Sequence, residues 1–573
     1  MIIKGGVVYD PANGIFGEEM DICVEGGKVV EDAGGEEIDA RGLLVMPGGV
    51  DAHSHIAGPK VNTGRIMCPN DGRMGIEPRT EVCRPSTGYT VPNCHAIGYR
   101  YARLGYTTAF EAATPIMESR HTHEELAEIP ILDKGALTLF GNNWEVMECV
   151  RDNDIGKLAA YVAWALRSSR GYGVKIVNPG GGEAWGFGAN VKGVNDPVPN
   201  FDVTPAEIIR GLARSNELLR LPHSIHLHFN NLGKPGNYTT ALETLELLKD
   251  ILPSRERQVV HVAHMQFSAY GGTSWRDFES KAQAIAEYFN QNTHATMDLG
   301  QIIFGNATTM TADGPLEYGN ARLLHAKWSN HDIELEEASG VVPLIYGRKM
   351  LVNAVQWAIG LELALLTKDP WKVLLTTDHP NGGPFVNYPE VIALLMSKAK
   401  RTEEMATLND QISKRTTLAG IDRELDWNEI VVMTRAAPAK VLGLKDKGHL
   451  GPGADADVSI YNLKPGEVDP EKDYQLVKKA LSQSKYTIKS GQVVSKSGSI
   501  LAVPEGRTYW VDASASVPEA DQERMMVDLK EKFDRYYSVQ MSNYMVQDAY
   551  IPHPMVIRPR PFDQLAETGK EVA

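Results

Sequence analysis

The chain has 573 residues, of which 43% are hydrophobic and 23% charged, and its formal net charge is -15. This composition is that of an ordinary globular protein, and the acidic balance disfavours nucleic acid and anionic membranes as partners. No uninterrupted apolar stretch reaches the length of a membrane span, and the first residues, MIIKGGVVYD, predict a strand and no signal peptide. We therefore expect a cytoplasmic protein that neither inserts into a membrane nor binds nucleic acid.

Cysteine spacing and nucleotide motifs narrow the possible cofactors. The five cysteines form no C-x-x-C pair, and the chain has neither a G-x-G-x-x-G after a strand nor a P-loop. We expect no iron–sulfur cluster in this chain and no nucleotide bound by the common motifs. Any metal must therefore be held by His, Asp, Glu or a modified Lys.

Two β-rich regions bracket the chain. Residues 1–46 and 436–510 are both interpreted as short strands and turns, among them IIKGGVVYD, YQLVKKALSQ and YTIKSGQVVSKSG. We predict that the two regions form one small β-sandwich domain built from both chain ends.

Residues 47–435 alternate apolar strands with helical stretches, which is typical of parallel βα units. The run LVNAVQWAIGLELALL from Leu351 predicts a buried helix, and long interruptions at 58–97 and 305–350 predict functional or partner-binding loops. The predicted strands are GGVDAHSH, YTTAFEA, GALTLFG, GVKIVNP, SIHLHF, QVVHVAH, ATMDLG and KVLLTTD. These strands predict an α/β fold, a closed (β/α)8 barrel of the TIM type with its active site at the carboxyl ends of the strands.

Residues 511–573 form a third region. DQERMMVDLKEKFDRYYSV has apolar residues at helical spacing, and the prolines of YIPHPMVIRPRPFDQL predict an extended arm. The arm carries Ile551, Met555, Val556, Ile557 and Phe562. It either packs on its own barrel or docks a partner protein, and the sequence leaves both open.

The first predicted strand ends in His53 and His55, which lie two residues apart and therefore point to the same face, into the barrel. Lys175 lies inside the apolar strand GVKIVNP, where its charge is costly to bury. One interpretation is a snorkelling lysine paired with a carboxylate. The other is a neutral amine that has reacted with CO2, because burial lowers the lysine pKa and the resulting carbamate can bridge two metals.

Two further strands end in histidine pairs, His226 with His228 and His261 with His264. We prefer His228 and His261 as ligands, because each closes an apolar strand. Asp378 closes VLLTTD, where the alternative is an N-cap of the next helix. Together the strand ends predict a site for two divalent metals, with zinc expected and iron, cobalt or manganese also compatible. The predicted ligands are His53, His55, Lys175, His228, His261 and Asp378.

These motifs resemble the binuclear amidohydrolases, such as dihydroorotase and the hydantoinases, and the stretch from Thr434 looks like that superfamily's return into its β-sandwich. A closer resemblance, over nearly the whole chain, is to the A subunits of formylmethanofuran dehydrogenase and of the methylotroph formyltransferase/hydrolase complex. It rests on HSHIAGPKVN from His53, TGYTVPNCHAIGYRYARLGYTTAFEAA from Thr87, IHLHFNNLGKPGN from Ile225, HVAHMQFSAYGG from His261 and TTDHPNGGPF from Thr376.

The resemblance implies a multi-subunit, CO2-reducing system of methanogenesis. A molybdenum or tungsten pterin subunit, served by iron–sulfur subunits, makes formate, and the A subunit condenses formate with the amine of methanofuran or hydrolyses formylmethanofuran in reverse. Asp378 would transfer the proton. We further predict that Lys60, Asn230, Asn231 and His264 bind substrate, Lys60 by attracting formate at the barrel mouth. An exposed lysine and turn-forming asparagines are the alternatives.

Three other functions remain open. One is the hydrolase subunit of a methylotroph complex, and another is a stand-alone cyclic amidohydrolase like hydantoinase or dihydroorotase. The third is a non-catalytic scaffold with a dead barrel, which the presence of all six predicted ligands disfavours.

Overall fold

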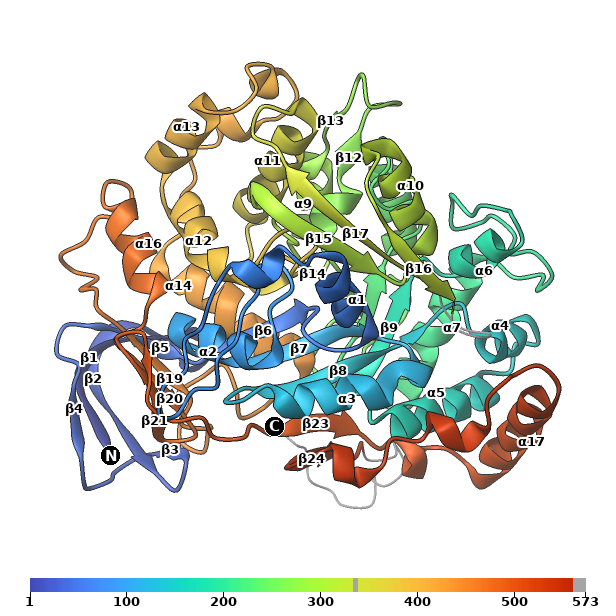
Figure 1. Ribbon diagram of the computed structural model, residues 1–573, viewed down its shortest axis with the longest axis horizontal. Coiled ribbons are helices and arrows are strands. Elements are labelled where there is room, and N and C mark those ends of the chain that lie inside the picture. The colour runs from blue at the N-terminus through green and yellow to red at the C-terminus, as the bar shows by residue number, and fades with distance from the viewer. Residues whose placement is uncertain (333–337, 560–573) are drawn as a thin grey trace.

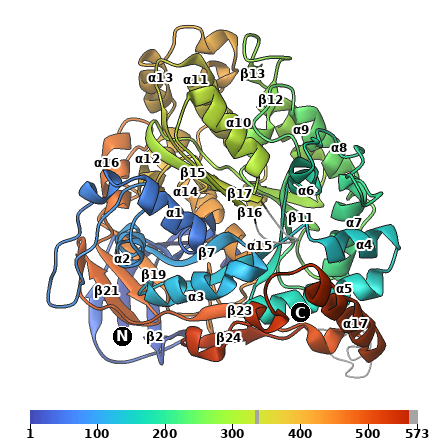
Figure 2. The ribbon, with the colours of Figure 1, turned by 45° about the vertical axis from the view of Figure 1, so that its right-hand side comes forward.

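The computed structural model describes residues 1–332 and 338–559. Within these residues, parallel strands form a ring at the centre of the molecule and helices surround it (Figure 1, Figure 2). The strands are β6 (Gly49–Ser54), β7 (Tyr106–Thr114), β8 (Asp133–Phe140), β9 (Gly173–Val177), β10 (Ile225–His228), β11 (Val260–Val262), β14 (Ala295–Asp298) and β18 (Val373–Leu374). A bridge between Ser54 and His379 joins the first strand to the residues after the last. The predicted (β/α)8 barrel and its eight strand positions are confirmed.

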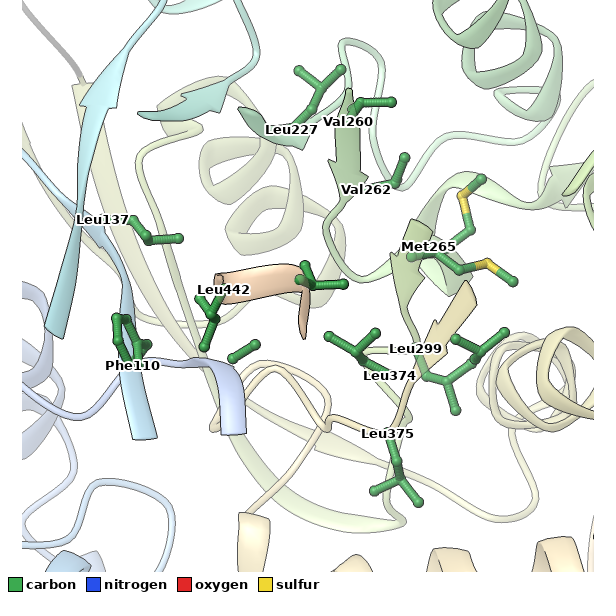
Figure 3. Packing of buried hydrophobic residues seen from close by; sticks show 14 of the residues in the cluster. Phe110, Leu137, Leu227, Val260, Val262, Met265, Leu299, Leu374, Leu375 and Leu442 are labelled. Atoms are coloured by element: carbon green, nitrogen blue, oxygen red, sulfur yellow. The ribbon is translucent and has the colours of Figure 1, made fainter. Parts of the chain in front are cut away.

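Side-chain alternation along the strands separates the core from the barrel interior. Leu227, Val260 and Val262 belong to the main hydrophobic cluster, as Figure 3 shows, and histidines alternate with them along β10 and β11. Because successive strand residues face opposite sides, these histidines point into the barrel.

Helices connect the strands on the outside of the barrel. The connecting helices are α2 (Cys94–Leu104), α3 (Ser119–Glu128), α4 (Trp144–Arg151), α5 (Ile155–Ser169), α6 (Gly181–Gly186), α7 (Pro205–Leu218), α8 (Tyr238–Glu246), α9 (Ala282–Gln291) and α11 (Leu351–Leu366). After β18 come α12 (Tyr388–Met396), α13 (Lys398–Ala406), α14 (Trp427–Val431) and α15 (Ala437–Leu442). Helix α11 confirms the buried helix predicted from Leu351. Among the described residues, no helix has the length and apolar character needed to cross a membrane.

The two chain ends meet in one nine-stranded sheet, in which β5 pairs antiparallel with β19. Its strands are β1 (Ile2–Asp10), β2 (Ile15–Glu25), β3 (Lys28–Val30), β4 (Glu37–Asp39), β5 (Leu44–Pro47), β19 (Val458–Tyr461), β20 (Tyr486–Lys489), β21 (Gln492–Lys496) and β22 (Ser499–Ile500). One prediction here was wrong, since most of YQLVKKALSQ forms the helix α16 (Tyr474–Ser482). Val477, Ala480 and Leu481 make its buried face at helical spacing.

The two long interruptions are folded and not simple loops. The second contains β15 (Gly305–Thr311), α10 (Gly314–Leu324), β16 (Ser329–Asp332) and β17 (Ala338–Tyr346), and its strands form a three-stranded antiparallel sheet. We call this sheet, together with α10, the cover. Helix α1 (Pro59–Met67) of the first interruption contacts β15 and β17. Figure 1 shows the cover across the middle of the molecule, close to α1.

The C-terminal region extends the barrel sheet. Helix α17 (Glu519–Arg535) confirms the predicted helix and packs on α5. Strand β23 (Thr508–Val511) pairs parallel with β8, and β24 (Pro554–Ile557) pairs parallel with β23. The arm is therefore extended as predicted and packs on its own chain as far as Ile557, while Phe562 lies outside the described residues.

Candidate active site

A cavity of about 360 Å³ is lined by residues from the carboxyl ends of the barrel strands and from the cover. Its lining includes six polar side chains that close or follow strands: His53, His55, Lys175, His228, His264 and Asp378. It also includes a set of apolar side chains: Phe267, Trp275, Leu316, Leu323, Ile345 and Met350. The cavity thus combines metal-binding and acid–base groups with an apolar wall.

Carboxylates hold both histidines of the first strand. The Nδ1 atoms of His53 and His55 lie 2.9 Å from carboxylate oxygens of Asp298 and Glu111, respectively. Both rings turn Nε2 toward Oδ1 of Asp378, at 3.0 Å from His53 and 3.4 Å from His55. Burial acts to lower the pKa of His53, but the Asp298 and Asp378 carboxylates raise it to about 9. The two rings are therefore preset to present Nε2 to one point near Asp378.

Asp378 sits in a strained backbone conformation, with φ of 48°. Non-glycine residues with positive φ are uncommon, and such strain concentrates at functional sites. The side chain of Asn381 donates to Oδ1 of Asp378 at 2.9 Å. Burial would raise the pKa of Asp378, yet the neighbouring histidines His53 and His264 hold it well below its usual value, so the side chain is a carboxylate at neutral pH.

Lys175 lies inside the barrel and is 1% exposed. Its Nζ has no hydrogen-bond partner among the described residues. Burial lowers the pKa of Lys175 to about 8, although nearby Asp298 and Asp378 oppose this. Lys134 on the neighbouring strand has a pKa lowered to a similar value, but its Nζ donates to the carbonyl of Ile129 at 2.6 Å. The unsatisfied amine is therefore a property of Lys175 and not of every buried lysine in this barrel.

The histidine pairs divide between the cavity and the layer behind it. His228 and His264 line the cavity, whereas His226 and His261 do not. Both ring nitrogens of His261 are engaged, with Thr296 Oγ1 at 2.9 Å and Asp298 Oδ2 at 3.2 Å. The Nδ1 of His264 has no partner among the described residues. The geometry thus agrees with the choice of His228 and favours His264 over the predicted His261.

A local turn explains why His264 reaches the cavity. Strand β11 ends at Val262, and His264 follows with φ of 34°. Gly300 leaves room for it, because a Cβ at that position would lie 2.4 Å from the Cβ of His264. The sequence prediction chose His261 because it closes an apolar strand, and it did not anticipate this turn.

Of the predicted substrate-binding residues, only His264 lines the cavity. Lys60 is buried and donates to the carbonyl of Ala113 at 2.6 Å, so it does not stand exposed at the mouth. Asn230 donates to Asn178 at 2.8 Å and to the carbonyl of Pro179 at 2.9 Å. Asn231 adopts a left-handed backbone with φ of 59°, which is typical of a turn. Asn231 fits the turn-forming alternative, whereas buried Lys60 fits neither a position at the mouth nor the alternative of an exposed lysine.

Several residues of the site were missed from the sequence. Asp298 and Glu111 belong to the predicted strands ATMDLG and YTTAFEA, so the rule that selected Asp378 would have found Asp298 at its strand end. Asp313 accepts from His228 Nε2 at 3.1 Å, and Asn381 links Asp378 to the cover through the backbone of Met310. No spacing in the sequence relates Asp313 to His228, or Asn381 to Met310, although Asn381 follows Asp378 by only three residues.

The donors fit a metal centre. One ligand atom each of His53, His55 and Asp378 lies within 4.8 Å of the others, and all three residues are buried. The unpartnered nitrogens of Lys175 and His264 border the same cavity. Buried polar atoms are rarely left unpaired, and imidazole with carboxylate donors suits divalent transition metals.

Comparison with known proteins agrees with this geometry. Residues 36–495 match the model of the amidohydrolase family. The chain belongs to the amidohydrolase family. Members of this family bind divalent metals, which fits the donor set of the cavity.

Two relatives match this amidohydrolase over almost its full length. It is 51% identical to protein FwdA of Methanocaldococcus jannaschii, over 97% of this chain and 98% of the relative. It is 37% identical to the A subunit of the formyltransferase/hydrolase complex Fhc of Methylorubrum extorquens, over 96% and 97% of the two chains. A crystal structure of that complex, FhcABCD with methylofuran, contains a chain that matches with a TM-score of 0.87 at 35% identity over 98% and 99% of the chains. The predicted family resemblance is confirmed.

Proposed function

We propose that this amidohydrolase makes and breaks the formyl amide of methanofuran, as the A subunit of a formylmethanofuran dehydrogenase. The observation that carries the proposal is a cavity that joins the histidine, lysine and aspartate cluster to an apolar wall, in a chain closely similar to FwdA and to the A subunit of Fhc. The reaction is formate + methanofuran ⇌ formylmethanofuran + water. An enzyme accelerates both directions, so the same residues serve synthesis and hydrolysis.

His53, His55, His228, His264 and Asp378 would hold two divalent metals, for which zinc is our assignment. Lys175 would join them as a carbamate, because its amine has a lowered pKa and no hydrogen-bond partner among the described residues. When bound, such metals polarise a carbonyl oxygen and make water a better nucleophile near neutral pH. His261, the ligand predicted first, would instead orient Asp298 behind His53.

Asp378 would move the proton. As a carboxylate it can accept a proton from the attacking water in hydrolysis and give it to the leaving amine nitrogen. In synthesis it accepts the proton of the attacking amine. Asn381 fixes Oδ1 of Asp378, and no residue within 1–332 and 338–559 is hydrogen-bonded to Oδ2, which can therefore face the substrate.

The remaining groups would bind and orient the substrates. The apolar wall suits the furan-bearing part of methanofuran, since aromatic surface gains free energy on burial. Lys60 adds positive potential near Lys175 and Glu111 from its buried position, and we propose that this favours entry of formate. Asn230 and Asn231 would shape the loop behind His228.

A stand-alone cyclic amidohydrolase is less consistent with the cavity. Dihydroorotate carries a carboxylate, and a site for it needs a cation. Among the described lining residues, Lys175 is the one lysine or arginine, and it belongs to the proposed metal centre. The cavity therefore favours a substrate that is apolar next to its reacting group.

The proposed function also implies partner subunits. The A subunit of Fhc belongs to a multi-subunit complex that was crystallised as FhcABCD. We propose that this chain assembles with a molybdenum or tungsten pterin subunit that produces formate and with iron–sulfur subunits, because a docked producer keeps the local formate concentration high.

The test is formate release from formylmethanofuran by the isolated full chain. We expect hydrolysis that is lost on metal removal by a chelator and restored by Zn²⁺, with hydantoin and dihydroorotate turned over far more slowly. Preferred hydrolysis of a cyclic amide, or hydrolysis that survives metal removal, would contradict the proposal.

A further inference from the structure

Glu317 is a cavity residue that the proposed chemistry does not use. It lies on α10 of the cover, lines the cavity and is 1% exposed. Gly340 of β17 packs against it, and a Cβ at Gly340 would lie 2.5 Å from the Cβ of Glu317. A carboxyl group is thus built into the wall beside Leu316, where a larger neighbour than glycine would displace it.

The burial of Glu317 and the carboxylates near it favour the neutral carboxylic acid. Thr309 Oγ1 lies 2.8 Å from Oε2 of Glu317 and 3.1 Å from the carbonyl of Val342. The Thr309 hydroxyl has one hydrogen for two acceptors, so its hydrogen bond to Glu317 competes with the one to the Val342 carbonyl and satisfies the buried carboxyl group only in part. Burial raises the pKa of Glu317 to about 8, with Asp313 and Asp378 adding to the rise and Thr309 and Asn320 opposing it.

The second carboxyl oxygen of Glu317 is available to a ligand. Thr309 and Asn320 both contact Oε2, and no donor among the described residues contacts Oε1. An acceptor in a largely apolar wall gains most from a ligand that brings an N–H donor. Asp313 and Asp378 add negative potential at Glu317, which favours an ammonium group at this part of the wall.

We propose that Glu317 recognises the primary amine of the substrate and holds its nitrogen at the cavity wall until it reacts. The inference rests on the proposed function, since it takes a primary amine as the substrate. A free amine carries three protons at neutral pH and Glu317 carries one, whereas the bound pair shares three. The fourth proton leaves to solvent, whether the pair is written as a carboxylate with an ammonium group or as an acid with a neutral amine. The neutral amine is the form with a lone pair that can attack formate.

The test is calorimetric titration of the metal-replete full chain with methanofuran at pH 7, in two buffers of different ionisation enthalpy. We expect about one proton released per amine bound. In Glu317→Gln we expect no proton release and an affinity for the amine that is lower by roughly tenfold or more. The KM for methanofuran should rise, while the KM for formate and the metal content should stay unchanged. Glu317→Met should give the same results as Glu317→Gln, and it serves as the test if Glu317→Gln does not fold.

The matched control is Glu362→Gln. Glu362 is also buried with a raised pKa, but it accepts from Ser280 and Thr417 and does not line the cavity. We expect the Glu362→Gln variant to release the same number of protons and to bind the amine as tightly as the wild-type chain. Wild-type affinity or persistent proton release in Glu317→Gln would overturn the inference while leaving the proposed function intact. A wild-type chain that does not hydrolyse formylmethanofuran would instead contradict the proposed function.

Discussion

Within residues 1–332 and 338–559, two buried regions bring together enough carboxylates or histidines to hold a metal ion, since two of the three groups share His53. One is the cavity cluster around His53, His55 and Asp378, and the other is formed by Asp133, Asp455 and Asp457, where Lys489 of β20 contacts Asp133 of β8. In the second cluster cations already occupy the centre. Lys447 Nζ lies 2.5 Å from Asp133 and from Asp457, and Lys489 lies 2.8 Å from Asp133.

The two clusters differ in whether their buried polar groups already have partners within the protein. In the aspartate cluster, carboxylates are paired with Lys447, Lys489 and Arg507, so the network is complete without a ligand. In the cavity cluster the nitrogens of Lys175 and His264 have no partner among the described residues. Because unpaired buried polar groups are costly, we infer that the aspartate cluster needs no ligand and that a ligand completes the cavity cluster.

The largest expected effect is that of Lys175→Ala. Loss of the bridging group should remove metal and reduce formylmethanofuran hydrolysis by at least ~10³-fold, since metals contribute several kcal/mol to such reactions. A short carboxylic acid should restore part of the activity. The measurements are metal analysis and formate release, with Lys134→Ala as the matched buried lysine. We expect that control to lower stability without loss of metal, and full activity in Lys175→Ala would exclude the carbamate.

Lys447→Met should lower stability and leave the chemistry intact. Removing one partner of a buried ion-pair network costs ~3–5 kcal/mol, because the aspartates remain buried and uncompensated. We expect a lower midpoint in denaturant unfolding, with unchanged metal content and kcat in the folded fraction. Metal loss in this variant would show that the two clusters are not independent.

Asp378→Asn should separate proton transfer from metal binding. The amide cannot accept a proton, so kcat should fall by at least ~10²-fold while much of the metal stays bound. Steady-state kinetics and metal analysis measure the two effects on one preparation. A variant with near-normal turnover would assign the proton transfer to another group.

The smallest effects separate the histidines within each pair. His228→Ala and His264→Ala should deplete metal more than His226→Ala and His261→Ala. The rings of His226 and His261 lie behind the cavity, so we expect their loss to lower metal affinity by ~10–100-fold. Metal content after dialysis against graded chelator ranks the four variants. If His261→Ala loses more metal than His264→Ala, the original strand-end choice was right and the geometric one is wrong.

The sequence predicted the barrel well because strand, helix and turn patterns are local. It also predicted that His53, His55, Lys175 and Asp378 converge, since the strands of a barrel end at one face. It could not distinguish His261 from His264, because that depends on a left-handed turn after Val262 and on space left by Gly300. The roles of Asp313, Asn381 and Glu317 were also hidden, because they arise where the cover meets the barrel, through contacts between residues distant in the sequence.

We infer that metal completes the cavity cluster and not the aspartate cluster. The most direct measurement is the metal content of the purified, folded chain, determined together with its formylmethanofuran hydrolysis. We predict about two divalent metals per chain, lost with activity in Lys175→Ala and retained in Lys447→Met. A fully active chain without bound metal, or a metal content that follows Lys447 and not Lys175, would contradict it.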